Sequence, residues 1–224
     1  MPETAPIPVR RRGQLSRARI LAAALELVDQ DGLEALTMRR LADQLRVDPM
    51  SIYNHVDGKD ALLDGLADAL WDQVEAPGRG SDWKEAFRLL ATSLRNLAHA
   101  HPHAYSLLFS RGFLPERALS AFDASLAALE RAGLNRQAAA EMLRTLLSYA
   151  VGYGMLELPA ASVSGSTELE RLVSITRAVP RDAPANLVEV ARLIADCDMD
   201  FQFDLGLDLI ISGLEVRLQG EIRT

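Results

Sequence analysis

Cysteine is almost absent from this chain, because Cys197 is the single one among its 224 residues and no internal disulfide can form. Long apolar runs are also absent, since no stretch reaches the roughly 18 residues that a membrane-spanning helix needs. Residues 1–14 contain no apolar segment of the kind found in a secretory signal. These absences favour a cytoplasmic protein that is stabilised by a packed core.

Alternation of apolar and polar residues with a period of two is missing as well, which argues against a β-sheet. Hydrophobic residues make up 49% of the chain and charged residues 25%, within the range of globular proteins. Apolar residues recur instead at helical spacing. This spacing predicts an all-α protein with helices over 16–30, 37–45, 49–56, 59–74, 83–97, 101–112, 115–132, 135–158, 168–179, 185–195 and 203–220.

Charge is distributed unevenly along the chain, whose formal net charge is −7. Residues 1–60 carry equal numbers of basic and acidic side chains, so the whole imbalance falls in 61–224. Five arginines lie between residues 10 and 19 with no acid among them. The acidic total therefore does not exclude a nucleic-acid partner, because a local basic patch matters more to phosphates. We expect 1–14 to be a flexible basic arm, which either reaches DNA or is a solvated tail.

The second and third predicted helices have the arrangement of a helix-turn-helix motif. Thr37 and Asp48 each stand where a side-chain oxygen can accept a hydrogen bond from backbone N–H groups at a helix start. Pro49 suits the first helical position, where its missing N–H costs nothing. The short connection between the helices begins with Arg46, where glycine would be commoner.

The third predicted helix has two different faces. Ile52 and Val56 are four residues apart and point toward a core. The other face mixes an amide, a hydroxyl, a phenol and an imidazole and carries no carboxylate, which suits contacts in a major groove. Its residues are Met50, Ser51, Tyr53, Asn54 and His55. The alternative is an ordinary surface helix.

Two stretches, SRARILAAALELVDQ and GLEALTMRRLADQLRVDPMSIYNHVDGKDALLDGLAD, resemble the DNA-binding domain of the tetracycline-repressor (TetR) family over about residues 16–67. The shared features include the Leu-Thr-x-Arg opening, the Tyr-x-His of the third helix and the lysine before Ala-Leu-Leu. WKEAFRLLATSLRNLAHAHPHA, AALERAGL and YAVGYGMLE resemble, more loosely, the family's regulatory domain. The resemblance implies a helix-turn-helix DNA-binding domain over 15–62 and a helical-bundle ligand-binding and dimerisation domain over 63–224.

The expected DNA contacts combine this resemblance with side-chain chemistry. We expect Thr37, Arg39, Arg40 and Lys59 to hold phosphates of a double-stranded operator. The residues expected to face the groove are Pro49, Met50, Ser51, Tyr53, Asn54 and His55. Asn54 is the first choice for a base contact, because an amide can bond adenine in two places.

Two late helices, over 135–158 and 203–220, are candidates for a homodimer interface. Each carries more apolar surface than a single core face needs, and helix-turn-helix proteins commonly read two-fold operators as dimers. The interface residues we expect are Leu143, Leu147, Val151, Leu205, Leu209 and Gly213. The resemblance implies the same arrangement, and the alternative is one larger monomeric core.

A pocket for a small molecule is expected between helices of the C-terminal bundle. Its candidate lining residues are Phe87, Leu90, Leu94, Tyr105, Phe109, Phe113, Phe122, Met142 and Tyr149, although plain core packing explains each one equally well. Family members that bind magnesium–tetracycline use polar side chains and imidazoles, and the matching positions here hold Leu90, Leu94 and Leu108. We therefore expect an apolar or aromatic effector and no tetracycline–magnesium site.

Other kinds of site are not supported by the sequence. His99, His101 and His103 alternate around a proline with no cysteine or paired carboxylate beside them, so a metal site is not expected. The acidic stretch from Asp196 lacks the glycine and the glutamate of a calcium loop and is interpreted as acidic surface ahead of the last helix. Gly152-x-Gly154 lacks a preceding strand and is no dinucleotide fingerprint. No cofactor and no enzymatic activity are expected.

These expectations combine into one hypothesis. The chain is expected to be a homodimeric transcriptional repressor that releases a palindromic operator when a small effector binds, with the helix over 59–74 carrying the movement. One alternative is a helical small-molecule-binding protein without a DNA role. Another is an all-α metalloenzyme built on the histidines.

Overall fold

The computed structural model describes residues 14–78, 80–111, 114–158, 184, 186 and 198–221. All the secondary-structure elements formed by these residues are helices, and none is a strand, which confirms the predicted all-α fold. The elements are α1 (Arg17–Asp31), the short 3-10 helix η1 (Leu33–Ala35), α2 (Met38–Leu45), α3 (Pro49–Tyr53), α4 (Gly58–Trp71), α5 (Trp83–Ala100), α6 (Leu107–Ser110), α7 (Glu116–Arg131), α8 (Arg136–Glu157) and α11 (Met199–Glu221). None of these helices combines the length and hydropathy needed to cross a bilayer.

Several expectations fall outside the described residues. They are the basic arm, Phe113, Cys197 and, apart from residue 186, the helices expected over 168–179 and 185–195.

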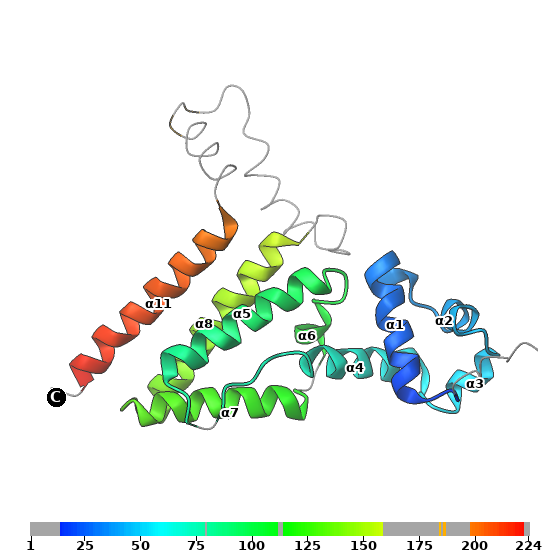
Figure 1. Ribbon diagram of the computed structural model, residues 1–224, viewed down its shortest axis with the longest axis horizontal. Helices are drawn as coiled ribbons and strands as arrows, with labels where there is room; N and C mark the ends of the chain where they lie inside the picture. The colour runs from blue at the N-terminus through cyan, green and yellow to red at the C-terminus, as the bar shows by residue number, and fades with distance from the viewer. Residues whose placement is uncertain are drawn as a thin grey trace, which may run out of the picture.

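The molecule has a head and a body (Figure 1). The head consists of α1, α2 and α3 at one end, and the body consists of α5, α6, α7, α8 and α11. α4 runs from the head into the body, and α11 lies beside α8 at the far end. The expected boundary between residues 62 and 63 falls inside α4, so this helix belongs to both parts.

The helix-turn-helix motif forms where its caps predict it. The Thr37 hydroxyl accepts a hydrogen bond from the backbone N–H of Arg40 at 3.1 Å, and the Asp48 carboxylate accepts one from the N–H of Met50 at 2.8 Å. Arg46 ends α2 in the left-handed conformation, with φ 55° and ψ 49°. This turn therefore sets the angle between α2 and α3 without a glycine.

The core of the head depends on α4. Ile20, Leu41 and Ile52 come from the three head helices and are fully buried. Leu62 and Leu66 of α4 are also fully buried in the same core. The head therefore packs directly on α4, which forms part of its core.

α8 and α11 pack closely through tyrosines. The Tyr149 hydroxyl donates to the carbonyl of Phe203 at 2.7 Å, and the Tyr153 hydroxyl donates to the carbonyl of Met199 at 2.9 Å. Gly206 makes room for this contact, because a Cβ there would lie 2.3 Å from the Tyr149 hydroxyl oxygen. The close approach of the two helices thus has a clear origin in the sequence.

Two predicted helix lengths were wrong in the head and in the loop after α5. α3 ends at Tyr53, and the N–H of His55 then bonds to the carbonyl of Ile52 at 2.9 Å, which places Asn54 and His55 in a turn. α6 covers Leu107–Ser110 alone, because residues 101–106 form successive turns. The turn after α3 still buries Val56, so the expected inner face is retained.

Two predicted helix starts also need correction. An aspartate before a helix commonly caps it, but Asp57 makes no side-chain capping hydrogen bond to α4, which begins at Gly58 rather than at the predicted residue 59. α11 begins at Met199, because the Asp198 carboxylate accepts hydrogen bonds from the N–H groups of Asp200 and Phe201 at 3.0 and 3.2 Å. The acidic stretch therefore lies largely on the last helix rather than ahead of it.

Candidate nucleic-acid interface and buried apolar site

α3 exposes the face that the sequence analysis assigned to DNA. Met50 is 68% exposed and Tyr53 is 44% exposed, although both are large. Ile52 on the opposite side is fully buried, so the two faces separate cleanly. Pro49, Asn54 and His55 are also exposed, and Ser51 is half-buried. This surface offers donors, acceptors and apolar atoms at the tip of the head, which are the groups that base edges recognise.

The residues assigned to phosphates surround this surface. Thr37, Arg39 and Lys59 are exposed. Arg40 is exposed too, but its guanidinium Nη2 lies 2.5 Å from the Asp31 carboxylate at the end of α1. The pair is about half exposed on each side, so water screens it and phosphate can compete with it. The structure adds Asp31 as a residue that the sequence analysis did not connect with DNA binding.

A histidine joins the head to the body. His101 follows α5, and its Nδ1 lies 2.8 Å from Oδ2 of Asp29 on α1, while its Nε2 lies 3.1 Å from the side-chain oxygen of Gln73. The His101 side chain is 14% exposed and that of Asp29 is 27% exposed. Two hydrogen bonds to one imidazole therefore connect α1, the end of α4 and the end of α5. No local spacing predicts these contacts, because Asp29 and Gln73 lie 72 and 28 residues before His101 in the sequence.

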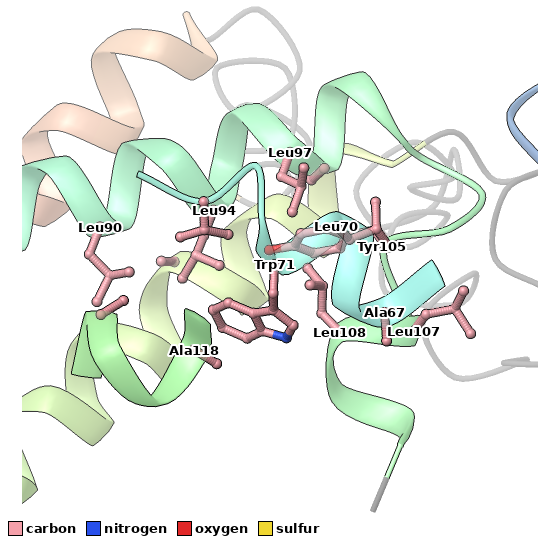
Figure 2. Close-up of a cluster of buried hydrophobic side chains, with 14 of the residues drawn as sticks. Ala67, Leu70, Trp71, Leu90, Leu94, Leu97, Tyr105, Leu107, Leu108 and Ala118 are labelled. Carbon is pink, nitrogen blue, oxygen red and sulfur yellow. The ribbon is translucent and has the colours of Figure 1, made fainter. Parts of the chain in front are cut away.

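The centre of the body is a cluster of apolar side chains, which Figure 2 shows. Trp71 enters it from α4, Leu90 and Leu94 from α5, and Tyr105 from the turns before α6. The other labelled members are Ala67, Leu70, Leu97, Leu107, Leu108 and Ala118. None of the labelled side chains carries a charge at neutral pH. Burial raises the pKa of the Tyr105 phenol, so this group stays protonated there.

Two polar atoms in this cluster have no hydrogen-bond partner, namely the indole Nε1 of Trp71 and the hydroxyl of Tyr105. Trp71 is 1% exposed and Tyr105 is fully buried, so bulk water does not reach either atom. Native proteins rarely leave buried donors unpaired, because each such group costs about 1–3 kcal/mol. Two unpaired donors in an otherwise apolar cluster indicate a place that can receive a hydrogen-bonding molecule.

The expected pocket residues differ in their burial and in the elements that they contact. Phe87, Leu90, Leu94 and Tyr105 are fully buried, while Phe122 and Met142 are half-buried. Phe109 is 42% exposed, but its ring lies edge-on to Trp71 and Tyr105 at 6.3 and 5.7 Å between centroids. Tyr149 instead stacks on Phe203 at 5.6 Å and serves the contact with α11.

Trp71 is not among the pocket residues expected from the sequence. It lies within the helix predicted over 59–74, where a tryptophan at a core position is unremarkable. The available signal was the indole N–H, because a buried tryptophan usually needs a hydrogen-bond acceptor. Leu97 and Leu107 were also missed as members of this cluster.

α11 is apolar on two faces. Phe203, Leu207 and Ile211 belong to its buried face, which packs on the body. Four large exposed residues share the other face, namely Phe201, Leu205, Leu209 and Val216, and Met199 lies at the start of the helix beside Tyr153 of α8. We refer to these four residues as the α11 outer face. Monomeric proteins seldom leave such a continuous apolar row in water.

The expected interface residues lie differently around α8 and α11. Leu205 is 41% exposed, Leu209 is 66% exposed and Gly213 is exposed. Leu147 and Val151 on α8 are half-buried. Leu143 is only 6% exposed, so the core of one chain already covers it. The accessible part of the expected interface therefore lies mostly on α11.

A buried ion pair anchors the start of α11 and was not foreseen from the sequence. The Arg95 guanidinium on α5 makes two hydrogen bonds to the Glu157 carboxylate at the end of α8, at 2.7 and 2.5 Å. It also contacts Asp200 at 2.8 Å and lies 4.8 Å from the ring centre of Phe203. The hydrogen bonds to Glu157 raise the pKa of Arg95 above its ordinary value. α5, α8 and α11 are thereby joined at one point.

Two of the three alternating histidines, His99 and His101, lie beside carboxylates. His99 Nε2 lies 2.9 Å from Glu157, and His101 bonds to Asp29. In the described part of the chain, no group of three or more His, Cys, Asp or Glu residues is arranged to hold a metal ion.

The head has a helix-turn-helix motif with an exposed face of uncharged polar residues, and α4 connects it to a helical body with unpaired donors at its centre. This combination defines a DNA-binding transcriptional regulator.

The comparisons with known proteins agree with this class. One family model, described as bacterial regulatory proteins of the tetR family, matches residues 20–66, and another, described as tetracyclin repressor-like C-terminal domain, matches 76–218. The chain therefore belongs to the tetR family of transcriptional regulators and is not an enzyme.

Individual relatives match over nearly their whole length. An HTH-type transcriptional regulator of Saccharopolyspora erythraea is 30% identical over 207 residues, which cover 92% of this chain and 86% of the relative. A possible TetR family regulator from Streptomyces coelicolor A3(2) has a TM-score of 0.76 at 27% identity and covers 90% of this chain and 99% of its own. ActR from Streptomyces coelicolor, in complex with actinorhodin, has a TM-score of 0.69 at 29% identity and covers 90% and 96%.

Proposed function

We propose that this regulator is a cytoplasmic homodimeric repressor, which binds a palindromic operator and releases it when a small apolar or aromatic effector enters the body. The observation that carries the proposal is the exposed, carboxylate-free face of α3 and its following turn, at the tip of a head that packs on α4. The opposite face of α3 packs in the core through Ile52. Folding therefore does not require the exposed face to be free of charged residues, and binding to DNA explains that property.

In the proposed complex, α3 enters the major groove. Asn54 lies in the turn that ends α3, where its amide can reach the edge of an adenine. Tyr53 and His55 also face the groove, where they partly contact the DNA backbone. Thr37, Arg39, Arg40 and Lys59 hold phosphates on either side.

Two copies are needed because a palindromic operator presents two half-sites. The α11 outer face supports this assembly, because a second α11–α8 pair would cover it as a four-helix bundle. A two-fold contact of this kind is self-complementary, so the same apolar row would serve both protomers.

Effector binding reaches the head by two routes in the proposed mechanism. α4 carries Trp71 at the central cluster and Leu62 and Leu66 in the core of the head. The turns after α5 carry Tyr105 in the cluster and His101 against Asp29 of the head. A ligand that shifts either element changes the spacing of the two heads in the dimer. The complex of ActR with actinorhodin supports a small-molecule effector for this chain.

The experiment is fluorescence anisotropy with a labelled palindrome taken from DNA beside the gene that encodes this protein, and with a scrambled duplex of equal length. Asn54→Ala should cost about 1–3 kcal/mol on the palindrome and little on the scrambled duplex. Asn96→Ala, the same change at an exposed position of α5, is the matched control and should leave both affinities unchanged. Equal loss on both duplexes would contradict the base contact, and no preference of the wild-type protein for any such palindrome would contradict the function.

A further inference from the structure

Among the described residues, three buried side-chain atoms lack a hydrogen-bond partner, and two of them belong to the central cluster of the body. These two are Nε1 of Trp71 and the hydroxyl of Tyr105. The third, Oδ1 of Asp29, lies at the contact between the head and His101. The unpaired donors are therefore concentrated where an effector is proposed to bind, rather than scattered through the protein.

The surroundings of the two donors are apolar and aromatic. The Trp71 ring meets Phe109 and Phe122 edge-on, with centroids 6.3 and 5.5 Å apart. The Tyr105 hydroxyl lies against Gly154 of α8, where a Cβ would come within 3.0 Å of its oxygen. Figure 2 shows leucine side chains from α4, α5 and α6 around both rings. Aromatic edges and leucines of this kind favour a flat, apolar ring system.

The donors add a second requirement to the ligand. An indole N–H can only donate, so its partner must be an acceptor such as a carbonyl or an ether oxygen. A charged ligand is disfavoured, because no labelled side chain of the cluster could neutralise it and a buried unpaired charge is costly. An uncharged ligand with an acceptor oxygen meets both conditions.

We propose that the central cluster selects uncharged, flat aromatic molecules that carry an acceptor oxygen, and that this oxygen receives the hydrogen bond of Trp71 Nε1. The proposal rests on the proposed function, since it names the chemical class of the effector. Tyr105 offers a second hydrogen bond within the same cluster, and its hydroxyl can donate or accept.

The position of Trp71 gives this hydrogen bond a regulatory meaning. Trp71 is the last residue of α4, and Gln73, two residues further on, bonds to His101, which in turn bonds to Asp29 of the head. A ligand held at the indole therefore acts on the same short segment that fastens the body to the head. Ligands of the same shape without the oxygen would fill the cluster but lack this hold on α4.

The test compares 9-fluorenone with fluorene, which share a flat tricyclic shape but differ in the carbonyl oxygen. Isothermal titration calorimetry is carried out on the full chain and on Trp71→Phe, with Trp83→Phe as the matched control. Trp83 is also buried on the body, but it pairs with Phe87 outside the labelled cluster. The ratio of the two dissociation constants within each protein cancels any general loss of packing in a variant.

The wild-type protein and Trp83→Phe should bind 9-fluorenone about five- to tenfold more tightly than fluorene, as one net hydrogen bond gives. The preference should vanish in Trp71→Phe. In Trp83→Phe labelled with ¹⁵N, the remaining indole N–H signal should move downfield with 9-fluorenone and not with fluorene. This second measurement needs no change at Trp71, so it stays informative if Trp71→Phe does not fold.

Three results would overturn the proposal: failure of the wild-type protein to bind 9-fluorenone, equal affinity for the two compounds, or a preference that survives in Trp71→Phe. The last result would show that Trp71 Nε1 does not bond to the ligand oxygen and pairs with a bound water instead. Release of the operator duplex by 9-fluorenone is measured separately by anisotropy. A Trp71-dependent preference without release would support the ligand class and contradict the effector role. Release without the preference would support the effector role and contradict the ligand class.

Discussion

Two outward surfaces of this molecule differ in their chemistry. The exposed face of α3 and its following turn carries an amide, a phenol, an imidazole and Met50, whereas the α11 outer face carries only large apolar side chains. Each belongs to a helix whose other face is buried in the core. A surface that reads DNA needs donors and acceptors in water, and a surface that meets its own copy needs apolar area. The difference therefore separates the two partners proposed for this chain.

The largest effect is expected from a charge on the α11 outer face. Leu209→Glu places a carboxylate at the centre of the apolar row, and two-fold symmetry doubles it, so the dimer should dissociate. Loss of the second half-site contact should weaken operator binding by about 100-fold or more. Sedimentation velocity and anisotropy measure the two effects.

Leu119→Glu is the matched control for Leu209→Glu. Leu119 is an exposed leucine on α7, outside the α11 outer face. This variant should remain dimeric and keep its operator affinity. A dimeric Leu209→Glu protein would remove α11 from the interface.

The ion pair that anchors α11 should contribute more to stability than exposed pairs do. Glu157→Gln leaves the buried Arg95 guanidinium with Asp200 as its charged partner, so the free energy of unfolding should fall by about 3 kcal/mol. Urea denaturation measures it. Glu130→Gln breaks the exposed pair with Arg136 and should cost less than about 1 kcal/mol. Equal costs for the two variants would show that burial does not strengthen this anchor.

Arg40 tests the phosphate contacts around α3. Arg40→Ala should weaken binding to the operator and to random DNA alike, by about 1 kcal/mol, and should reduce the salt dependence by about one released counterion. The measurement is the slope of log affinity against log salt concentration. Asp31→Asn should have the opposite effect on affinity, because it frees Arg40 from its ion pair. An unchanged slope in Arg40→Ala would rule out a phosphate contact.

The smallest effect is expected at the contact between head and body. His101→Ala removes the hydrogen bonds to Asp29 and Gln73, which should cost about 1 kcal/mol and loosen the end of α1. Amide hydrogen exchange at the end of α1 should then become a few times faster, while exchange in α8 stays unchanged. Unchanged protection of α1 would show that packing on α4 alone holds the head.

The features that the sequence predicted are those with local causes. Thr37 and Asp48 cap their helices as expected, because capping depends on neighbours within three residues. The apolar excess of the last helix was visible in its sequence and became two apolar faces in the structure. The length of α3 was not predictable in the same way, because its end depends on how Val56 turns back into the core.

The features that the sequence did not predict depend on long-range contacts. Arg95 and Glu157 are 62 residues apart, and Asp29 and His101 are 72 residues apart, so no spacing along the chain connects them. The unpaired N–H of Trp71 depends on the helices that surround the indole, so it could be seen only in the structure. The site residues on α3 remain predictions that the exposed surface supports.

Methionine oxidation tests the central claim most directly, because α3 and α11 each carry one exposed methionine. Met50 lies on α3 and Met199 on α11, with 68% and 39% of their surfaces exposed. Mass spectrometry after brief peroxide treatment gives the oxidation rate of each residue with and without the operator duplex. The account predicts that the operator protects Met50 strongly and leaves Met199 unchanged. Equal oxidation of Met50 in the free and the DNA-bound protein would contradict the assignment of α3 to the groove.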